Sequence, residues 1–273
     1  MTLNEATRLL SEAKIPSPSQ DARMIFEHFD GRDLTYLLSH PDTVASPEAE
    51  AAIRRRAKRE PLQYILGEVA FYNELYRVTP DCLIPRSDTE ILVEYAVKHI
   101  PKGERLIDLC TGSGCIAVST LCNTRGTTAL AVDISEAALK IAEENADKNG
   151  VSDRISFIRA DLLSDNPLTI SEKAYAVLSN PPYIAREVYE GLEPELFCEP
   201  EVALVAENDG LCFYDVLVPL GLSLINDGGF LAYEIGYDQA EHLRALAAAS
   251  GANIEIIKDY SGNDRVAVIR KRG

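Results

Sequence analysis

Two motifs in the middle of the chain combine residue types that could bind a nucleoside. Asp108-Leu-Cys-Thr-Gly-Ser-Gly114 lies between an apolar run and a helical pattern, so its glycines would let a ligand lie against the backbone. About twenty residues further on, Asp133 ends the next apolar run, where its carboxylate could accept both hydroxyls of a ribose. An ordinary strand-to-helix turn without a ligand is the alternative.

The sequence around the glycine turn also disfavours two common cofactors. It lacks the third glycine of a dinucleotide-binding motif, and the chain contains no G-x-x-x-x-G-K-[ST] sequence, so NAD and ATP are disfavoured. The six cysteines include no C-x-x-C pair, and the four histidines do not cluster near them. We therefore predict reduced, mostly buried thiols and no metal site.

The third motif, Asn180-Pro-Pro-Tyr183, directly follows an apolar run and, with the glycine motif, resembles the S-adenosylmethionine-dependent methyltransferases that modify planar NH2 nitrogens. The resemblance implies that this loop activates a nitrogen. A planar NH2 group is a poor nucleophile toward a sulfonium methyl because its lone pair is delocalised. The side-chain oxygen of Asn180 and the C=O of Pro181 could each accept one N–H, which would turn the lone pair toward the methyl group. Pro181 and Pro182 would restrict the backbone and hold these acceptors in place, and Tyr183 could pack on the flat group. A proline-stiffened loop without a chemical role is the alternative.

The elements that must position these motifs are short apolar runs separated by helical stretches. This alternation favours a mainly parallel sheet covered on both faces. Only residues 259–264 separate the last two runs, which is too few for a helical crossover, so these two should pair antiparallel. We therefore predict an α/β fold with a seven-stranded sheet and a terminal antiparallel hairpin, its strands at residues 105–109, 129–133, 155–158, 174–178, 230–235, 254–258 and 265–269.

The first 65 residues have a different pattern, which predicts a small helical bundle. Thr2 and Glu5 form a capping box, and Ser46-Pro47 places a cap residue before a proline at the next helix start. Residues 69–78 alternate around a polar turn and predict a β-hairpin connector. We therefore expect a helical domain with its connector over residues 1–75 and a second domain over residues 76–273.

The composition limits the partners. The chain has 273 residues with 27 basic and 43 acidic groups, a net charge of −16, and 46% hydrophobic residues, which is typical of a soluble globular protein and not of a disordered or fibrous one. The negative charge disfavours direct binding of nucleic acid. No signal peptide and no apolar run of about 18 residues is visible, so we expect a cytoplasmic protein without a membrane partner.

The glycine motif followed by Asn-Pro-Pro-Tyr resembles the S-adenosylmethionine-dependent methyltransferases that modify planar NH2 nitrogens. Residues 61–67, Phe71, residues 83–90 and the helical start narrow this resemblance to the bacterial release factor glutamine methyltransferases of the PrmC/HemK type. The resemblance spans nearly the whole chain. Further positions that fit are Glu199-Pro200, Leu204, Gly210-Leu211 and Glu234-Ile-Gly236.

The resemblance implies a class I methyltransferase (Rossmann-like) fold and N5-methylation of the glutamine in the Gly-Gly-Gln loop of class-1 peptide chain release factors. S-adenosyl-L-methionine would be the cofactor and S-adenosyl-L-homocysteine the product. Separately from the resemblance, we expect a monomer, although the sequence itself carries no signal for the oligomeric state. Catalysis would fall to Asn180, Pro181 and Tyr183, and substrate contacts to these three and Pro182. The implied cofactor contacts are Cys110, Thr111, Gly112, Ser113 and Gly114, Asp133 at the ribose, Asp161 and Leu162 at the adenine, and Asn180.

Three further features raise expectations beyond the motifs themselves: the Pro85-Arg86 pair, Cys110 and a run of basic residues. Pro85 and Arg86 would line the cofactor or substrate entrance. Cys110 stands where the family usually has glycine, so we expect an ordinary backbone conformation there and a slightly narrower methionine pocket that still binds. We disfavour reactive-thiol chemistry at this cysteine. The basic run at residues 54–59 is a solvated helix face or, as a hypothesis, a docking patch for the release factor.

Two other functions compete with this interpretation. A methyltransferase acting on adenine or guanine in nucleic acid uses the same tetrapeptide, but it would normally bring a basic groove or a target-recognition domain. A catalytically silent adaptor would be expected to have lost Asp133 or Asn180, and both are present. Methylation of a protein glutamine is therefore the favoured prediction.

Overall fold

The computed structural model describes residues 1–164, 170 and 172–272. Contacts divide the chain into two compact units. The helical unit comprises Met1–Glu68 together with Glu193–Cys198, and the sheet unit comprises Val69–Leu192 together with Glu199–Gly273. The predicted division into functional domains at residue 75 stays a prediction.

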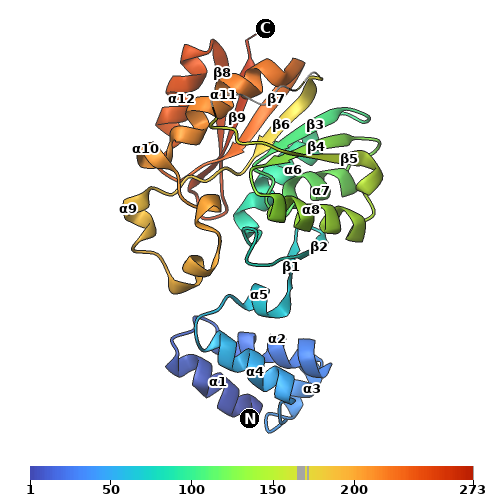
Figure 1. The fold of residues 1–273 in the computed structure, drawn as a ribbon, viewed down its shortest axis with the longest axis vertical. Helices are drawn as coiled ribbons and strands as arrows, with labels where there is room; N and C mark the ends of the chain where they lie inside the picture. Colours follow the sequence, from blue (N-terminus) through green and yellow to red (C-terminus); the bar gives the residue numbers. More distant parts are fainter. Residues whose placement is uncertain (165–169, 171, 273) are drawn as a thin grey trace. The chain divides into compact units, whose positions relative to one another are not determined.

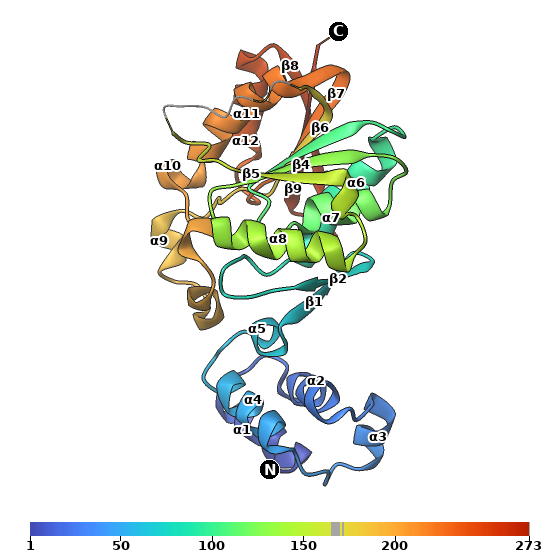
Figure 2. The same cartoon turned by 45° about the vertical axis from the view of Figure 1, so that its right-hand side comes forward.

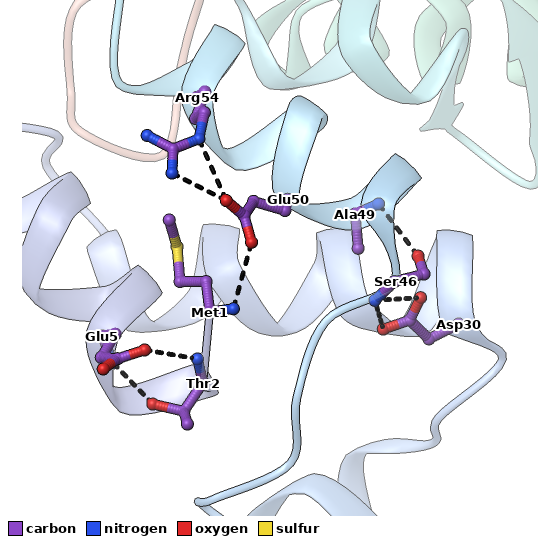
Figure 3. A network of polar contacts seen from close by, with 8 residues as sticks. All are labelled: Met1, Thr2, Glu5, Asp30, Ser46, Ala49, Glu50 and Arg54. Atoms are coloured by element: carbon purple, nitrogen blue, oxygen red, sulfur yellow. Dashed lines mark hydrogen bonds and ion pairs between the residues drawn. The ribbon is translucent and has the colours of Figure 1, made fainter.

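The helical unit is the small bundle that the sequence predicts (Figure 1). Thr2 and Glu5 form the predicted capping box, with bonds of 3.2 and 2.8 Å, and the Ser46 side chain accepts from the N–H of Ala49 at 3.1 Å (Figure 3). Apolar side chains such as Leu10 form its core. The helices are α1 (Leu3–Glu12), α2 (Pro18–Asp30), α3 (Leu34–Ser39), α4 (Pro47–Arg56) and α5 (Leu62–Leu66).

The basic run at residues 54–59 is not an unpaired cationic face. Arg54 donates to Glu50 at 2.7 Å, and the same carboxylate accepts from the amino group of Met1 at 3.1 Å (Figure 3). Arg55 pairs with Glu60. These acidic partners cancel much of the positive charge that a docking patch would need.

Two further arginines of this run are structural. Arg56 is buried and donates to Asp21 at 2.7 Å and to Glu195 at 2.9 Å. Arg59 donates to the other oxygen of Glu195 at 2.6 Å. Although burial alone would raise it, the pKa of Glu195 is lowered, mainly because Arg56 and Arg59 donate hydrogen bonds to its carboxylate. The expectation of a solvated basic face is therefore wrong for Arg56, because tertiary ion pairs hold its side chain inside the unit.

The sheet unit begins with the predicted hairpin, β1 (Glu68–Phe71) and β2 (Glu74–Arg77). In the described part of the chain the main sheet has seven strands in the order β5-β4-β3-β6-β7-β9-β8. The first five in this order run parallel, whereas β9 pairs antiparallel with both β7 and β8, as the short connection predicts. The strands are β3 (Arg105–Leu109), β4 (Thr128–Asp133), β5 (Ile155–Arg159), β6 (Ala174–Ser179), β7 (Ile225–Glu234), β8 (Ala252–Lys258) and β9 (Asp264–Lys271).

Helices cover both faces of this sheet (Figures 1 and 2). Alternate strand residues face opposite layers, so Leu106 belongs to the cluster around α6 and α7, whereas Ile107 belongs to the cluster around α11 and α12. The longer helices are α6 (Glu90–His99), α7 (Cys115–Cys122), α8 (Glu136–Lys148), α11 (Cys212–Leu224) and α12 (Ala240–Ala249), and α9 (Arg186–Tyr189) and α10 (Glu207–Gly210) are short. No helix within the described residues is long and apolar enough to cross a membrane.

The strand order places the three sequence motifs together. β3 lies between β4 and β6, which is the point where the order of strands along the chain reverses. Ligands of open α/β sheets bind in the crevice at the carboxyl ends of the strands at such a point. The glycine turn, Asp133 and Asn180 follow or end these three neighbouring strands.

Candidate active site

A cavity of about 670 Å³ opens at the carboxyl ends of β3, β4 and β6. This volume falls within the roughly 300–1,000 Å³ of small-molecule sites. Among the described residues, Gly114, Pro181 and Tyr183 lie outside its lining. The predicted site residues that line it are Cys110, Thr111, Gly112, Ser113, Asp133, Asp161, Leu162, Asn180 and Pro182, and Pro85 and Arg86 join them.

The glycine turn takes an unusual backbone conformation at Cys110. Its φ is +59°, in the left-handed region that favours glycine, so our expectation of an ordinary conformation is wrong. The turn must reverse directly after β3, and this requirement overrides the preference of the side chain. Burial, together with the charge of Asp133, raises the pKa of the thiol, which disfavours a reactive thiolate.

The two glycines of the turn have different tasks. Gly112, with φ +54°, donates its N–H to Asp133 at 2.8 Å. Gly114, with φ +81°, packs against α8, and a Cβ there would lie 3.0 Å from that of Ala142. The second glycine therefore serves helix packing behind the turn, which explains why it does not line the cavity.

Asp133 is held in place from two sides. Its Oδ2 accepts from the N–H of Gly112 at 2.8 Å, and its Oδ1 accepts from the N–H of Ser135 at 2.9 Å. A carboxylate offers roughly four lone-pair sites, so acceptor capacity remains for two hydroxyls. Burial raises the pKa of this carboxyl, and the backbone hydrogen bonds oppose the shift. This geometry fits the ribose of a nucleoside.

Behind the turn, Asp108 is fully buried at the end of β3. Its Oδ2 accepts from the hydroxyl of Thr111 at 2.6 Å and from the N–H of Ala117 at 3.3 Å. Its Oδ1 has no hydrogen-bond partner among the described residues. Burial raises the pKa of Asp108 to about 7, against the opposing effect of the two hydrogen bonds. This carboxyl braces the turn and does not line the cavity.

The Asn-Pro-Pro-Tyr loop is fastened at both ends. Before it, the hydroxyl of Ser179 donates to the C=O of Leu109 at 2.6 Å, which ties the ends of β6 and β3 together. After it, the side-chain amide of Gln239 donates to the C=O of Tyr183 at 3.0 Å. Asn180 lies between these anchors and belongs to the cavity lining.

Two residues at this loop were missed by the sequence reasoning. The amide nitrogen of Asn180 donates to the hydroxyl of Thr89 at 3.2 Å, and this hydroxyl donates to Glu234 at 2.6 Å. Tyr183 donates to the other oxygen of Glu234 at 3.2 Å. Both residues lie in segments that fit the family pattern, residues 83–90 and Glu234-Ile-Gly236, but nothing in the sequence indicates that these segments meet.

The far end of the cavity is lined by residues that follow β4 and β5. Asp161 and Leu162 line it, and Oδ1 of Asp161 accepts from the N–H of Leu163 at 2.9 Å. Ile134 is exposed beside Asp133 and also lines the cavity. An apolar side chain next to Asp133 would suit the flat face of a base. Its place directly after Asp133 is the only sign of such a role in the sequence.

The segment before α6 closes another side of the cavity. Arg86 pairs with Glu199, whose buried carboxylate also accepts from the N–H of Ile84 at 3.0 Å. Glu199 therefore holds the Pro85-Arg86 segment at the lining. Within the described ranges, no three His, Cys, Asp or Glu side chains are grouped so that they could hold a metal ion.

Comparison with solved structures defines the class of protein. A ribosomal protein L11 methylase from Lactobacillus delbrueckii subsp. bulgaricus aligns with a TM-score of 0.51 and 23% identity, over 72% of this chain and 85% of that one. A tRNA m1G37 methyltransferase from M. jannaschii aligns with a TM-score of 0.52 and 14% identity, over 76% and 57% of the two chains. The fold is that of a class I methyltransferase, as predicted.

Comparison of sequences narrows the class to a family. Residues 2–67 match the PrmC N-terminal domain, and residues 87–207 match the methyltransferase small domain. A release factor glutamine methyltransferase from Bordetella pertussis is 39% identical over 92% of this chain and 94% of its own length. One from Moorella thermoacetica is 37% identical over 99% and 97% of the two chains. The chain belongs to the family of release factor glutamine methyltransferases.

Proposed function

We propose that this protein transfers a methyl group from S-adenosyl-L-methionine to the side-chain nitrogen N5 of the glutamine in the Gly-Gly-Gln loop of class-1 peptide chain release factors. S-adenosyl-L-homocysteine would be the product. The observation that carries the proposal is Asn180, which lies in the lining of the cavity directly after β6 and beside the glycine turn.

The cofactor would be held by residues already positioned in the cavity. Thr111 and Gly112 would contact its methionine part, Asp133 its ribose, and Asp161 with Leu162 its adenine. When bound, the cofactor supplies an electrophilic methyl group on a positively charged sulfur.

The loop would prepare the nucleophile. Oδ1 of Asn180 and the C=O of Pro181 would each accept one N–H of the substrate amide, which directs its lone pair toward the methyl donor. Tyr183 stays a proposed contact of the flat group, although its hydroxyl is engaged by Glu234. No general base is needed before the transfer, because the proton can leave afterwards.

The helical unit would dock the release factor. The enzyme must select one glutamine among many, and this selection needs contacts beyond those of the catalytic sheet. The ion pairs of Arg54, Arg55, Arg56 and Arg59 argue against the basic run as the docking site. We also propose that the protein is a monomer and is located in the cytoplasm. We propose no direct contact with nucleic acid, because the net charge of −16 opposes binding of a phosphate backbone.

One assay tests the proposal. The protein is incubated with methyl-labelled S-adenosylmethionine and, separately, with a release factor, with its Gly-Gly-Gln loop variant carrying Gln→Ala, and with DNA or rRNA. We expect label in the intact factor alone. Label in nucleic acid would favour the rival methyltransferase, and label in none of the substrates would refute the proposal.

A further inference from the structure

A chain of hydrogen bonds runs from the cavity into the core behind the Asn-Pro-Pro-Tyr loop. The amide nitrogen of Asn180 lies 3.2 Å from the hydroxyl of Thr89, which lies 2.6 Å from Oε2 of Glu234. The other carboxylate oxygen accepts from the hydroxyl of Tyr183 at 3.2 Å. Thr89 and Glu234 are 2% and 1% exposed, so water does not compete for these bonds.

The direction of each bond in this chain is fixed by chemistry. An ionised carboxylate only accepts hydrogen bonds, so both hydroxyls that face Glu234 must donate to it. The hydroxyl of Thr89 has one hydrogen, and once this is donated to Glu234 its oxygen can only accept from Asn180. The NH2 group of the Asn180 amide must then face Thr89, and Oδ1 must face the other way.

The pKa of Glu234 is raised, because the effect of burial outweighs that of its hydrogen bonds and of the nearby positive charge. Burial raises the pKa of this carboxyl, whereas the hydrogen bond from Thr89, the positive charge of Arg265 and the hydrogen bond from Tyr183 act in the opposite direction. Arg265 follows the first residue of β9, next to β7, and it also pairs with Asp259 at 3.2 Å. The carboxylate of Glu234 is therefore a buried acceptor of two hydroxyl hydrogen bonds, close enough to Arg265 to feel its charge.

We propose that Thr89 and Glu234 are positioning residues that fix which way round the amide of Asn180 lies. This inference rests on the proposed function, in which Oδ1 of Asn180 must accept an N–H from the substrate amide. A flipped Asn180 would present its own NH2 group to the substrate NH2 group, so two donors would face each other and the substrate nitrogen would not be held.

The test removes the hydroxyl without changing the shape of the side chain. Thr89→Val should lower kcat on an intact release factor about tenfold, the effect of losing one oriented hydrogen bond. Thr89→Ser keeps the hydroxyl and should restore most of kcat. Binding of S-adenosylmethionine, measured by calorimetry, should change by less than about twofold, because the residues proposed to hold its methionine part, ribose and adenine are unchanged.

Thr120→Val is the matched control. Thr120 is similarly buried and does not line the cavity, and its hydroxyl donates to the C=O of Ile116 at 2.7 Å within α7. This variant should match Thr89→Val in melting temperature but keep the wild-type kcat. A loss of stability alone would lower the activity of both variants. A loss of the orientation of Asn180 would lower only that of Thr89→Val.

Combination with Asn180→Ala decides whether Thr89 acts through Asn180. In an Asn180→Ala background, Thr89→Val should have no further effect on kcat, because there is no amide left to orient. A further tenfold loss would overturn the inference, since Thr89 would then contact the substrate itself.

Glu234→Gln is the second variant, because an amide in place of the carboxylate no longer dictates the direction of the Thr89 hydroxyl. Wild-type kcat in whichever of Thr89→Val and Glu234→Gln folds would also overturn the inference. If the wild-type protein itself transfers no methyl group to a release factor, the proposed function fails first, and the two failures are distinguishable.

Discussion

Asn180 is the residue on which the proposed chemistry depends. Asn180→Ala should lower kcat on a release factor by about 100-fold or more, because it removes an acceptor that stabilises mainly the transition state. The dissociation constant of S-adenosylmethionine should change little. Steady-state kinetics and calorimetry measure the two quantities separately, and equal losses in both would indicate a structural role.

A surface asparagine provides the control for this variant. Asn73 lies in the exposed turn of the β1–β2 hairpin, where its side chain donates to Asn123 at 3.1 Å. Asn73→Ala should leave both kcat and cofactor binding unchanged, because the residue is not part of the cavity lining.

Asp108 links the glycine turn to the pH dependence of stability. Its pKa is raised by burial to about 7, so the folded protein binds a proton that the unfolded chain releases near pH 4. The contribution of Asp108 to the free energy of unfolding is fully present below about pH 4, the pKa of the carboxyl in the unfolded chain. This contribution is lost as the pH rises through about 7, the pKa in the folded protein. The change amounts to roughly 4 kcal/mol at most.

Asp108→Asn should remove this dependence. The amide oxygen can accept from Thr111 and Ala117 as Oδ2 does, and the variant should gain stability relative to wild type between pH 4 and pH 7. Urea denaturation across this range measures the difference. Asp153→Asn, which removes a charge at an exposed site, should show no such trend, and parallel curves for wild type and Asp108→Asn would contradict the prediction.

At the scale of elements, α10 and the Asn-Pro-Pro-Tyr loop are packed together through a glycine. Gly210 has φ +82°, and a Cβ there would lie 2.2 Å from the carbonyl oxygen of Tyr183 and 2.9 Å from Nε2 of Gln239. The first contact is with backbone, which cannot move aside without displacing the loop. Gly210 is therefore required for the position of the loop that carries Asn180.

Gly210→Ala should lower kcat at least tenfold and destabilise the protein by more than the roughly 1 kcal/mol expected from backbone strain alone. Gly228 has φ +80°, and a Cβ there would meet no atom within 4 Å, so Gly228→Ala carries the strain without the clash. This control should melt slightly earlier than wild type and keep its kcat. Equal kcat values for the two variants would show that the loop tolerates the displacement.

The sequence predicts the elements well because their signals are local. Apolar runs marked each strand of the sheet, and the short connection at residues 259–264 indicated the antiparallel end. The neighbouring positions of the glycine turn and Asn180 followed from the usual order of strands in such sheets. Strands and their order can be predicted from such patterns without knowing individual side-chain contacts.

What the sequence did not predict depends on contacts between distant residues. Thr89 lies 91 positions from Asn180 and 145 from Glu234, so no spacing rule could connect them. Arg56 looked solvated because its partner Glu195 is 139 positions away. The left-handed conformation of Cys110 is not predicted, because a residue with a side chain disfavours that region. Only the folded turn shows that the tight reversal after β3 overrides this preference.

At the scale of the whole molecule, the helical unit depends on a segment far along the chain. Residues Glu193–Cys198 belong to it by their contacts, and Glu195 supplies a carboxylate to both Arg56 and Arg59. Glu195→Gln in the full chain should destabilise this unit by about 2 kcal/mol, because buried Arg56 would keep only one anionic partner. Hydrogen exchange of residues 1–68 would measure the loss.

An exposed ion pair of the same unit serves as the comparison. Arg8 and Glu12 lie 3.9 Å apart with most of both side chains in solvent. Glu12→Gln should change the stability by less than about 0.5 kcal/mol. Similar exchange rates in the two variants would mean that the Glu195 pairs contribute no more than a surface contact does.

The membership of residues 193–198 in the helical unit also affects any exchange of parts between relatives. A chimera that replaced only residues 1–68 would combine the helices of a relative with the native Glu195. In the native protein this carboxylate forms ion pairs with Arg56 and Arg59. Recombination at a single crossover point is therefore expected to yield mismatched ion pairs. A graft that carries the distant hexapeptide along with the amino-terminal piece would preserve them.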